Sequence, residues 1–458
     1  MKQEIAKKAL LAKANKPAEL ATRLHPFYRG KMQTMPKCPV RDFSDFAIWY
    51  TPGVAAPCLE IKADKEKVYQ LTNKWNTIAV VSDGSRVLGL GDIGPEAAMP
   101  VMEGKALLFK YLGGVDAVPI CLGTKDPDEI IQAVKWLQPS FGGINLEDFA
   151  SPKCFYILDR LRAEAEIPIW HDDQQGTAAV TLAGLINALK VVGKNKEDVK
   201  LAIIGVGAAN TAILRVLFVD GFKPENTLIV DSKGILHSGR SDLREHKQDN
   251  PYKWDLAKKT NPEKRAGGIK EALEGADVCI SLAKSGPGVI RPEWVKGMAK
   301  DAVVFACANP VPEIWPWEAK GAGARVVVTG RSDFPNQVNN SLVFPGIFRG
   351  TLDVKARTIT DEMCIAAAYE VAKCAEDRGI HEEYIIPTMA EWEVNIRVAV
   401  AVGFKAIQQR VAREKASRKQ LAERAEKIIK EAREATALLM KEGLIPPLPR
   451  FFDKPLKQ

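Results

Sequence analysis

The sequence predicts an α/β protein: an N-terminal α/β domain, then a doubly wound, Rossmann-like domain, then a helical C-terminal tail. Three observations lead to this prediction. Short apolar runs alternate with helical runs from about residue 77 to residue 165, which is typical of a parallel sheet. A second series of strand-like runs begins at residue 201, and each run ends in polar residues or glycine. From about residue 395 the pattern is wholly helical.

The elements can be assigned in chain order. Residues 1–24 are expected to be helical, and residues 25–57 are rich in proline and aromatic residues without clear periodicity. Strands are expected at TIAVVSD, AVPICLG, GGINLED and IPIWHDD, and then at LAIIGVG, TLIVDS, ADVCISLA, DAVVFACANP and ARVVVTG. The apolar helix TAAVTLAGLINALKVVG separates the two series. We therefore expect domains at 1–166 and 167–410, with a tail at 411–458.

Composition favours small-molecule chemistry in the cytoplasm. The chain has 458 residues, enough for two or more domains, and its net charge of +8 is modest for that length. We expect no nucleic-acid partner, because long runs of like charge are absent from the sequence. We also expect no membrane contact, because no uninterrupted apolar stretch is long enough to cross a bilayer. The eight cysteines form no C-x-x-C pair, which suits a reducing compartment.

Two acidic pairs follow strand-like runs. Glu147 and Asp148 end GGINLED, and Asp172 and Asp173 end IPIWHDD. In open α/β folds the carboxyl ends of strands line the ligand crevice, so these acids are expected to lie close together. Carboxylates of this kind suit Mg²⁺ or Mn²⁺. Zinc with His171 as a ligand is one alternative, and helix capping by the acids is another.

Two glycine loops compete for a dinucleotide. Gly89-x-Gly91-x-x-Gly94 matches the glycine fingerprint of dinucleotide-binding loops more closely, but the segment 205–210 has more suitable neighbouring segments. That segment lies between an apolar strand and an apolar helix, and Asp231 ends the next strand, where an acid can bind a ribose diol. A tight turn without a ligand remains the structural alternative for either loop. We assign the dinucleotide to the second loop, which consists of Gly205, Val206, Gly207, Ala208, Ala209 and Asn210.

Five further residues are candidates on weaker grounds. Lys105 lies on an apolar helix, where burial is expected to lower its pKa toward use as a base. Tyr50 precedes a Pro-Gly turn, and Arg86 follows a strand and could hold a carboxylate. Asn309 and Asn340 lie in loops of the second domain. A surface lysine, a buried aromatic ring and ordinary turn asparagines are the corresponding structural interpretations.

Seven motifs occur together in a characteristic order. They are YTPGVAAPC, SDGSRVLGLGDIG, EGKALLFK, GGINLEDF, HDDQQGTAAV, CANPVPE and NNSLVFPGIFRG. This series, from about residue 25 to residue 410, closely resembles the malic enzymes, in their short microbial form without an appended acyltransferase domain. The resemblance implies metal-dependent oxidative decarboxylation of (S)-malate to pyruvate and CO₂ with reduction of NAD or NADP. It also implies a homodimer or a higher homo-oligomer.

The resemblance further implies roles for individual residues. Lys105 would be the general base, Tyr50 the general acid, and Asp172 a partner of Lys105. Tyr50 could serve the site of a neighbouring subunit. The metal ligands would be Glu147, Asp148 and Asp173. Contacts to malate or to the nicotinamide side would come from Arg86, Asn309 and Asn340.

The cofactor loop would be 205–210, although Asn210 stands where the third glycine of the fingerprint is usual. Asp231 favours NAD, whereas Lys233 or Arg240 could receive the extra phosphate of NADP, so both cofactors stay open. Two other functions also stay open. One is an oxaloacetate decarboxylase without a net redox step, and the other is a non-catalytic dinucleotide-binding protein.

Overall fold

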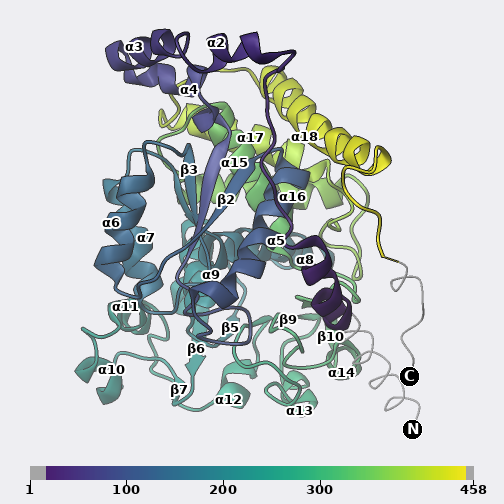
Figure 1. Ribbon diagram of the computed structural model, residues 1–458. Coiled ribbons are helices and arrows are strands. Elements are labelled where there is room, and N and C mark those ends of the chain that lie inside the picture. The colour runs from purple at the N-terminus through teal and green to yellow at the C-terminus, as the bar shows by residue number, and fades with distance from the viewer. Residues whose placement is uncertain (1–16, 450–458) are drawn as a thin grey trace.

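The computed structural model describes residues 17–449, which form two mainly parallel sheets surrounded by helices (Figure 1). The expected N-terminal helix falls partly outside this range, and residues 17–28 are helical. The first sheet has the strand order β2-β1-β3-β4, and all of its strands are parallel. Its strands are β1 (Thr77–Ser82), β2 (Asp116–Cys121), β3 (Gly143–Leu146) and β4 (Ile169–His171).

Alternating side chains of the first sheet pack against helices on both faces. One face packs against α6 (Pro127–Leu137) and α7 (Lys153–Glu164), and the other against α5 (Pro95–Gly113) and α15 (Phe344–Asp353). Because β4 pairs with β3, this sheet extends to His171. The domain boundary expected after residue 166 therefore stays a prediction, and it would separate β4 from its sheet.

The second sheet has the order β10-β9-β8-β5-β6-β7. Its strands are β5 (Leu201–Ile204), β6 (Thr227–Asp231), β7 (Gly234–Ile235), β8 (Val278–Ser281), β9 (Ala302–Ala306) and β10 (Ala324–Thr329). All pairs are parallel except β6 with β7. The strand order reverses direction between β5 and β8, as in doubly wound nucleotide-binding folds. The predicted α/β fold class is thus confirmed.

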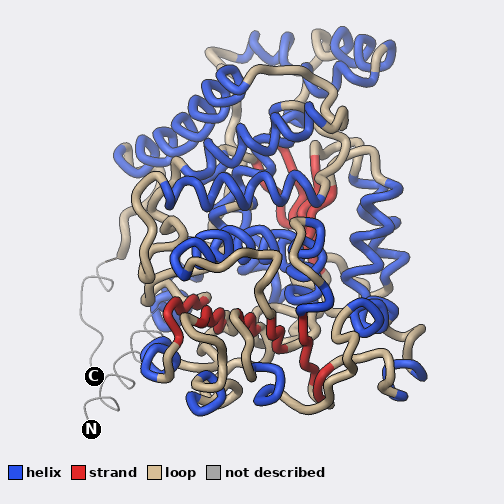
Figure 2. The backbone as a smooth tube through the Cα atoms, turned by 180° about the vertical axis from the view of Figure 1, so that it is seen from behind, coloured by secondary structure: helices blue, strands red, loops and turns tan. Residues whose placement is uncertain are grey.

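Helices surround the second sheet and join it to the first (Figure 2). They are α8 (Thr177–Val192), α9 (Ala208–Val219), α10 (Ser241–Glu245), α11 (Pro251–Lys259), α12 (Ile269–Leu273), α13 (Pro292–Val295), α14 (Pro316–Gly321) and α16 (Asp361–Glu376). Among the described residues, the stretch Asp172–Val192 has the length and apolarity of a membrane span, but 72% of its apolar window is buried in the protein. It forms part of the main core.

The chain ends in the helices α17 (Val394–Gln408) and α18 (Arg418–Lys441). Ser417 caps α18 by accepting a hydrogen bond from the Gln420 amide, while the Gln420 side chain accepts one from the Ser417 amide. The residues of α18 that are buried recur every three or four positions and pack on the chain's own α5, α15 and α17. They are Leu421, Ala425, Ile429 and Ala432.

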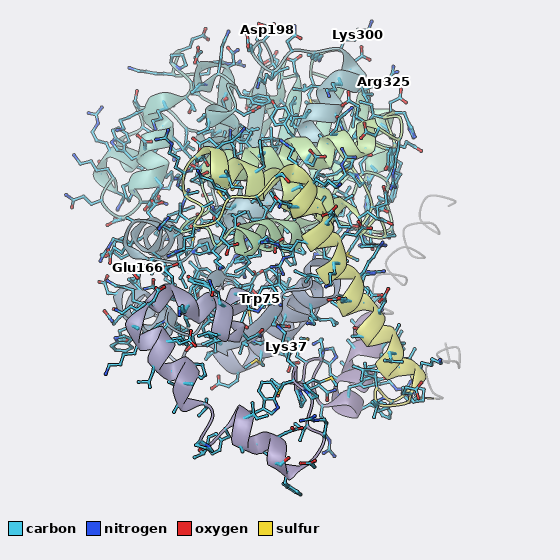
Figure 3. All side chains as sticks on the ribbon, turned by 90° about the horizontal axis from the view of Figure 1, so that it is seen from above. Lys37, Trp75, Glu166, Asp198, Lys300 and Arg325 are labelled. Atoms are coloured by element: carbon cyan, nitrogen blue, oxygen red, sulfur yellow. The ribbon has the colours of Figure 1, made fainter. Side chains whose placement is uncertain are left out.

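An N-terminal group of short helices lies at the end of the molecule away from the second sheet (Figure 1). Its helices are α2 (Phe46–Trp49), α3 (Ala55–Ala63) and α4 (Val68–Leu71). The segment before α2 is held against the first domain by a cation–π contact, in which Lys37 Nζ lies 4.6 Å from the centroid of the Trp75 ring (Figure 3).

Candidate functional site

The register of two neighbouring strands brings the acidic pairs together. β3 and β4 are parallel, and Leu146 is paired with His171. Glu147 and Asp172 directly follow these two strands and therefore lie at the same edge of the sheet. Both carboxylates reach Lys105, whose Nζ lies 2.9 Å from Glu147 Oε1 and 2.5 Å from Asp172 Oδ2. Helix α5 supplies Lys105.

Three of the carboxylates form a group that can hold a cation. Glu147, Asp148 and Asp173 each offer an oxygen, and these oxygens lie within 4.8 Å of one another. The Asp148 amide donates to Asp173 Oδ2 over 2.8 Å, which ties the two acidic pairs to each other. Asp148 has a φ of 59°, a left-handed conformation that is uncommon outside glycine.

The electrostatics of this group fit a divalent cation. Burial, reinforced by the charge of Asp173, raises the pKa of Asp148 to about 8. Burial likewise raises the pKa of Glu147 well above its ordinary value, although Lys105 opposes that shift. Within residues 17–449, Asp148 Oδ2 is buried without a hydrogen-bond partner. A divalent cation such as Mg²⁺ or Mn²⁺ would offset the repulsion between these carboxylates.

His171 is placed beside this group and not within it. Its Nδ1 lies 3.7 Å from Asp173 Oδ2, and the ring packs edge-on against Phe149 with centroids 6.0 Å apart. Burial holds the pKa of His171 below its ordinary value, although the charge of Asp173 opposes this shift. Both ring nitrogens lack a hydrogen-bond partner among the described residues. The arrangement favours an oxygen-only cation site over a zinc site.

We expected burial to lower the pKa of Lys105, and that expectation is wrong. Burial by itself would lower the pKa of Lys105, but Asp172 and Glu147 outweigh it and raise the pKa above its ordinary value. Two carboxylates within hydrogen-bond distance stabilise the ammonium more than desolvation destabilises it. Sequence periodicity predicts that Lys105 lies on an apolar helix face but does not show which charges surround it.

Two aromatic residues that sequence reasoning missed complete the surroundings of Lys105. Trp170 Nε1 donates to Asp172 Oδ1 over 3.1 Å, and the Phe344 ring lies 4.4 Å below Lys105 Nζ. The alternation of side chains along a strand could have indicated Trp170, because residues two positions apart, such as 170 and 172, point to the same face. Phe344 lies in the motif NNSLVFPG beside Asn340, whose Nδ2 donates to Asp172 Oδ2 over 3.0 Å. The structure thus places Asn340 against Asp172.

The remaining predicted substrate residues, Arg86 and Asn309, lie in loops that follow strands of the two different sheets. Arg86 is exposed, and its amide donates to the Asp148 carbonyl over 2.9 Å. Asn309 is exposed in the loop after β9, and a Cβ atom on Gly89 would lie 3.3 Å from its carbonyl oxygen. The glycine loop of the first domain therefore faces Asn309 of the second.

Tyr50 is not brought into this cluster. It follows α2, and 70% of its surface is exposed. Its amide donates to the Phe46 carbonyl. The described contacts of Lys105 come from the ends of β3 and β4 and from Phe344 at the start of α15, and Tyr50 is not among them.

The loop 205–210 is a tight turn between β5 and α9, as the proposed dinucleotide role would require. Gly205 has a φ of 99°, and a Cβ atom there would lie 2.9 Å from the Leu282 carbonyl. Gly207 caps α9, so amides of the helix N-terminus face the loop. Asn210, 1% exposed, donates from Nδ2 to the carbonyls of Ile204 (2.9 Å) and Gly205 (3.1 Å). Its side chain thus holds the loop where a third glycine is usual.

The position of this loop in the sheet agrees with that role. It follows β5, at the point where the strand order reverses. The Gly205 amide donates to the Val230 carbonyl over 2.8 Å, which places the loop beside Asp231 at the end of β6. The competing loop lies in the first domain, where the amides of Ile93 and Gly94 donate to the Gly84 carbonyl. That loop packs on its own backbone.

Comparisons with known proteins agree with this geometry. The malic enzyme N-terminal domain model matches residues 29–162, and the malic enzyme NAD binding domain model matches residues 174–407. The NAD-dependent malic enzyme of Geobacillus stearothermophilus is 52% identical over 84% of this chain and 78% of that protein. The NADP-dependent malic enzyme of Escherichia coli (strain K12) is 43% identical over 84% of this chain and 51% of that protein. The crystal structure of Entamoeba histolytica malic enzyme, 48% identical, superposes with a TM-score of 0.93 over 97% of this chain and 92% of that one. The chain therefore belongs to the malic enzyme family.

Proposed function

We propose that the protein catalyses oxidative decarboxylation of (S)-malate to pyruvate and CO₂, with NAD or NADP as the hydride acceptor. The family predicted from the sequence motifs is confirmed by both domain models. One observation carries the proposal: carboxylates and a lysine that is only 12% exposed meet at one edge of the first sheet, and a dinucleotide-type glycine loop follows β5 of the second. A dinucleotide-type loop argues against a lyase without a redox step.

The carboxylate group would hold Mg²⁺ or Mn²⁺. Its ligands would be Glu147, Asp148 and Asp173. A divalent cation bound there supplies a Lewis acid that stabilises negative charge on substrate oxygen. Lys105, next to this group, would take the proton from the C2 hydroxyl of malate. For that step Lys105 must first lose its own proton, and Asp172, 2.5 Å from Nζ, is placed to receive it.

The substrate and the nicotinamide would be positioned from both sheets. Arg86 would bind a malate carboxylate, because a guanidinium can donate two parallel hydrogen bonds to it. Asn309 faces the glycine loop of the first domain and would contact the nicotinamide side. Asn340, through its hydrogen bond to Asp172, would orient that carboxylate toward Lys105. The dinucleotide itself would bind along 205–210, with Asp231 near the adenosine ribose.

We further propose a homodimer in which Tyr50 acts in the partner's site. Tyr50 is expected to return a proton to C3 after CO₂ has left, yet here it is exposed and separate from Lys105. The surface around it is apolar, which is typical of a protein interface. The exposed apolar residues are Phe43, Phe46, Ile48, Trp49, Val54 and Leu59.

A complementation experiment tests the shared site. Tyr50→Phe and Lys105→Met variants are each purified and then mixed under conditions that exchange subunits. If Tyr50 crosses the interface, mixed dimers regain about one functional site for every two chains. Activity that stays at the level of the separate variants, despite proven exchange, contradicts the sharing.

The activity is tested by supplying malate and Mn²⁺ with NAD or NADP and following reduced nicotinamide and pyruvate together. Equal amounts of both products support the proposal. Pyruvate from oxaloacetate without reduced nicotinamide from malate would indicate the decarboxylase, and no product with either substrate would indicate a binding protein. We also place the protein in the cytoplasm, since all eight cysteines are free.

A further inference from the structure

Glu313 is a buried carboxylate that has no part in the proposed chemistry. It lies in the segment between β9 and α14, and none of its surface is exposed. Ser281 Oγ donates to Glu313 Oε1 over 2.8 Å, and the Ala283 amide donates to the same oxygen over 3.1 Å. The Ala308 amide donates to Oε2 over 3.0 Å. These three donors are a hydroxyl and two backbone amides, and none of them carries a charge.

A carboxylate in such a place needs a physical reason. Burial raises the pKa of Glu313, and the hydrogen bonds that it accepts from Ala308, Ala283 and Ser281 oppose that shift. Glutamate is almost never fully buried unless its charge is paired, because a buried charge loses its hydration. Donors that come from two separate loops suit a residue that fixes those loops relative to each other.

Both loops belong to the proposed dinucleotide site. The loop after β8 packs against Gly205, because a Cβ atom there would lie 2.9 Å from the Leu282 carbonyl oxygen. The loop after β9 carries Asn309, which directly follows Ala308. The Glu313 carboxylate thus connects the loop that supports the glycine loop with the loop that carries Asn309.

Asn309 is exposed, but the backbone on both sides of it is anchored. On one side Glu313 accepts from the preceding amide, and on the other Arg331 Nη1 donates to the Pro310 carbonyl over 2.8 Å. The Asn309 side chain lies against Gly330, where a Cβ atom would come within 2.8 Å of Asn309 Nδ2. A side chain on an anchored loop loses little freedom when a ligand binds, which favours affinity.

We propose that Glu313 is a positioning residue for the nicotinamide half of the dinucleotide. Its carboxylate fixes the backbone before Asn309 relative to the glycine loop, so that the Asn309 side chain is already in place when the nicotinamide arrives. Glu313 itself touches neither the dinucleotide nor malate. The inference rests on the dinucleotide site of the proposed function, with Asn309 as its contact to the nicotinamide.

Glu313→Gln tests this role with little change of shape. A glutamine side chain has one accepting oxygen and one NH₂ group. In either orientation the NH₂ group faces one of the two backbone amides, so the hydrogen bond to that amide is lost and one loop is released. Asp353→Asn is the matched control, because Asp353 is a buried carboxylate on α15, where Arg349 pairs with it.

The Kd values of NADH and of ADP-ribose, which lacks the nicotinamide, are measured by calorimetry on the full chain. NADPH and 2′-phospho-ADP-ribose form a second pair, and thermal unfolding checks the folding of each variant. Asn309→Ala and the double variant Asn309→Ala/Glu313→Gln are measured beside them, because two changes that act through one contact are not additive.

A hydrogen bond to a charged group contributes about 10- to 100-fold in affinity. In Glu313→Gln the Kd of the dinucleotide that the wild type binds more tightly should therefore rise at least 10-fold. The Kd of the matching ADP-ribose should change by less than about threefold, and Asp353→Asn should leave both values within that limit. In the Asn309→Ala background, Glu313→Gln should weaken binding by less than about threefold.

Hydrogen exchange of the wild-type chain gives a second test that needs no variant. The Ala308 amide should be protected before any dinucleotide is added, because Glu313 already holds it. Protection that arises only with NADH or NADPH overturns the proposal.

The binding data can overturn it in three further ways: an unchanged dinucleotide Kd in Glu313→Gln, equal weakening of the dinucleotide and its ADP-ribose, or full additivity with Asn309→Ala. A wild-type protein that binds neither dinucleotide overturns this inference together with the dinucleotide site. A wild-type protein that binds a dinucleotide but forms no reduced cofactor from malate overturns the proposed activity alone, and the Kd comparison still tests Glu313.

Discussion

Replacing Lys105 by methionine separates the electrostatic role of this residue from its chemical role. Methionine keeps an unbranched side chain against Phe344 but removes the ammonium that lies 2.9 Å from Glu147 and 2.5 Å from Asp172. The Lys105 side chain is 12% exposed, and the Asp172 side chain is fully buried. Removing one partner of a buried ion pair costs about 3–5 kcal/mol. We expect the free energy of unfolding of the metal-free protein to fall by that amount.

Added Mn²⁺ should restore part of the lost stability but none of the lost turnover. A positioned proton-transfer group contributes about 10²- to 10⁴-fold, so kcat for pyruvate formation should drop at least 100-fold. Saturating Mn²⁺ should recover part of the lost stability, because it brings positive charge to Glu147, but it should not recover kcat. Urea unfolding with and without Mn²⁺, together with steady-state kinetics, measures both effects.

Lys110→Met is the matched control. Lys110 lies on the same helix, and its ion pair with Asp116 is more exposed, so its loss should cost about 0–1 kcal/mol and leave kcat unchanged. If Lys105→Met keeps kcat within tenfold of the wild type, the proton-transfer role is refuted. If it unfolds at the same urea concentration as Lys110→Met, the reasoning about the buried ion pair is refuted.

Three other variants test separate parts of the structure. Asp173→Asn should raise the Kd for Mn²⁺ at least 10-fold by calorimetry, and an unchanged Kd would contradict its role as a ligand. Gly205→Ala places a Cβ atom 2.9 Å from the Leu282 carbonyl at a φ of 99°. It should weaken dinucleotide binding and destabilise the fold by about 1–3 kcal/mol, and unchanged binding would argue against this loop. Arg349→Met leaves the buried Asp353 without its cation and should cost about 3–5 kcal/mol in urea unfolding, with kcat within twofold of the wild type.

Much of the fold follows from local patterns that the sequence carries. The strand-like runs at TIAVVSD, GGINLED and LAIIGVG become β1, β3 and β5, because apolar runs of this length are bounded by polar or glycine residues. The choice of the second glycine loop also followed from its context between an apolar strand and an apolar helix, which the structure shows as β5 and α9. Sequence position did not reveal that Asn210 folds its side chain back onto Ile204 and Gly205.

The sequence by itself determined the family, the α/β class and which acids end strands, since these depend on residue order and on side-chain spacing within one element. Only the tertiary structure decided how the charges meet. Lys105 and Asp172 are 67 positions apart, and the pKa of Lys105 is raised because chain folding places two carboxylates beside it. The same holds for Lys253, whose contact with Asp231 depends on how α11 lies beside β6. Electrostatic energies depend on the distance between charges in space. Residues far apart along the chain come close enough to interact only when the strands pair and the helices pack.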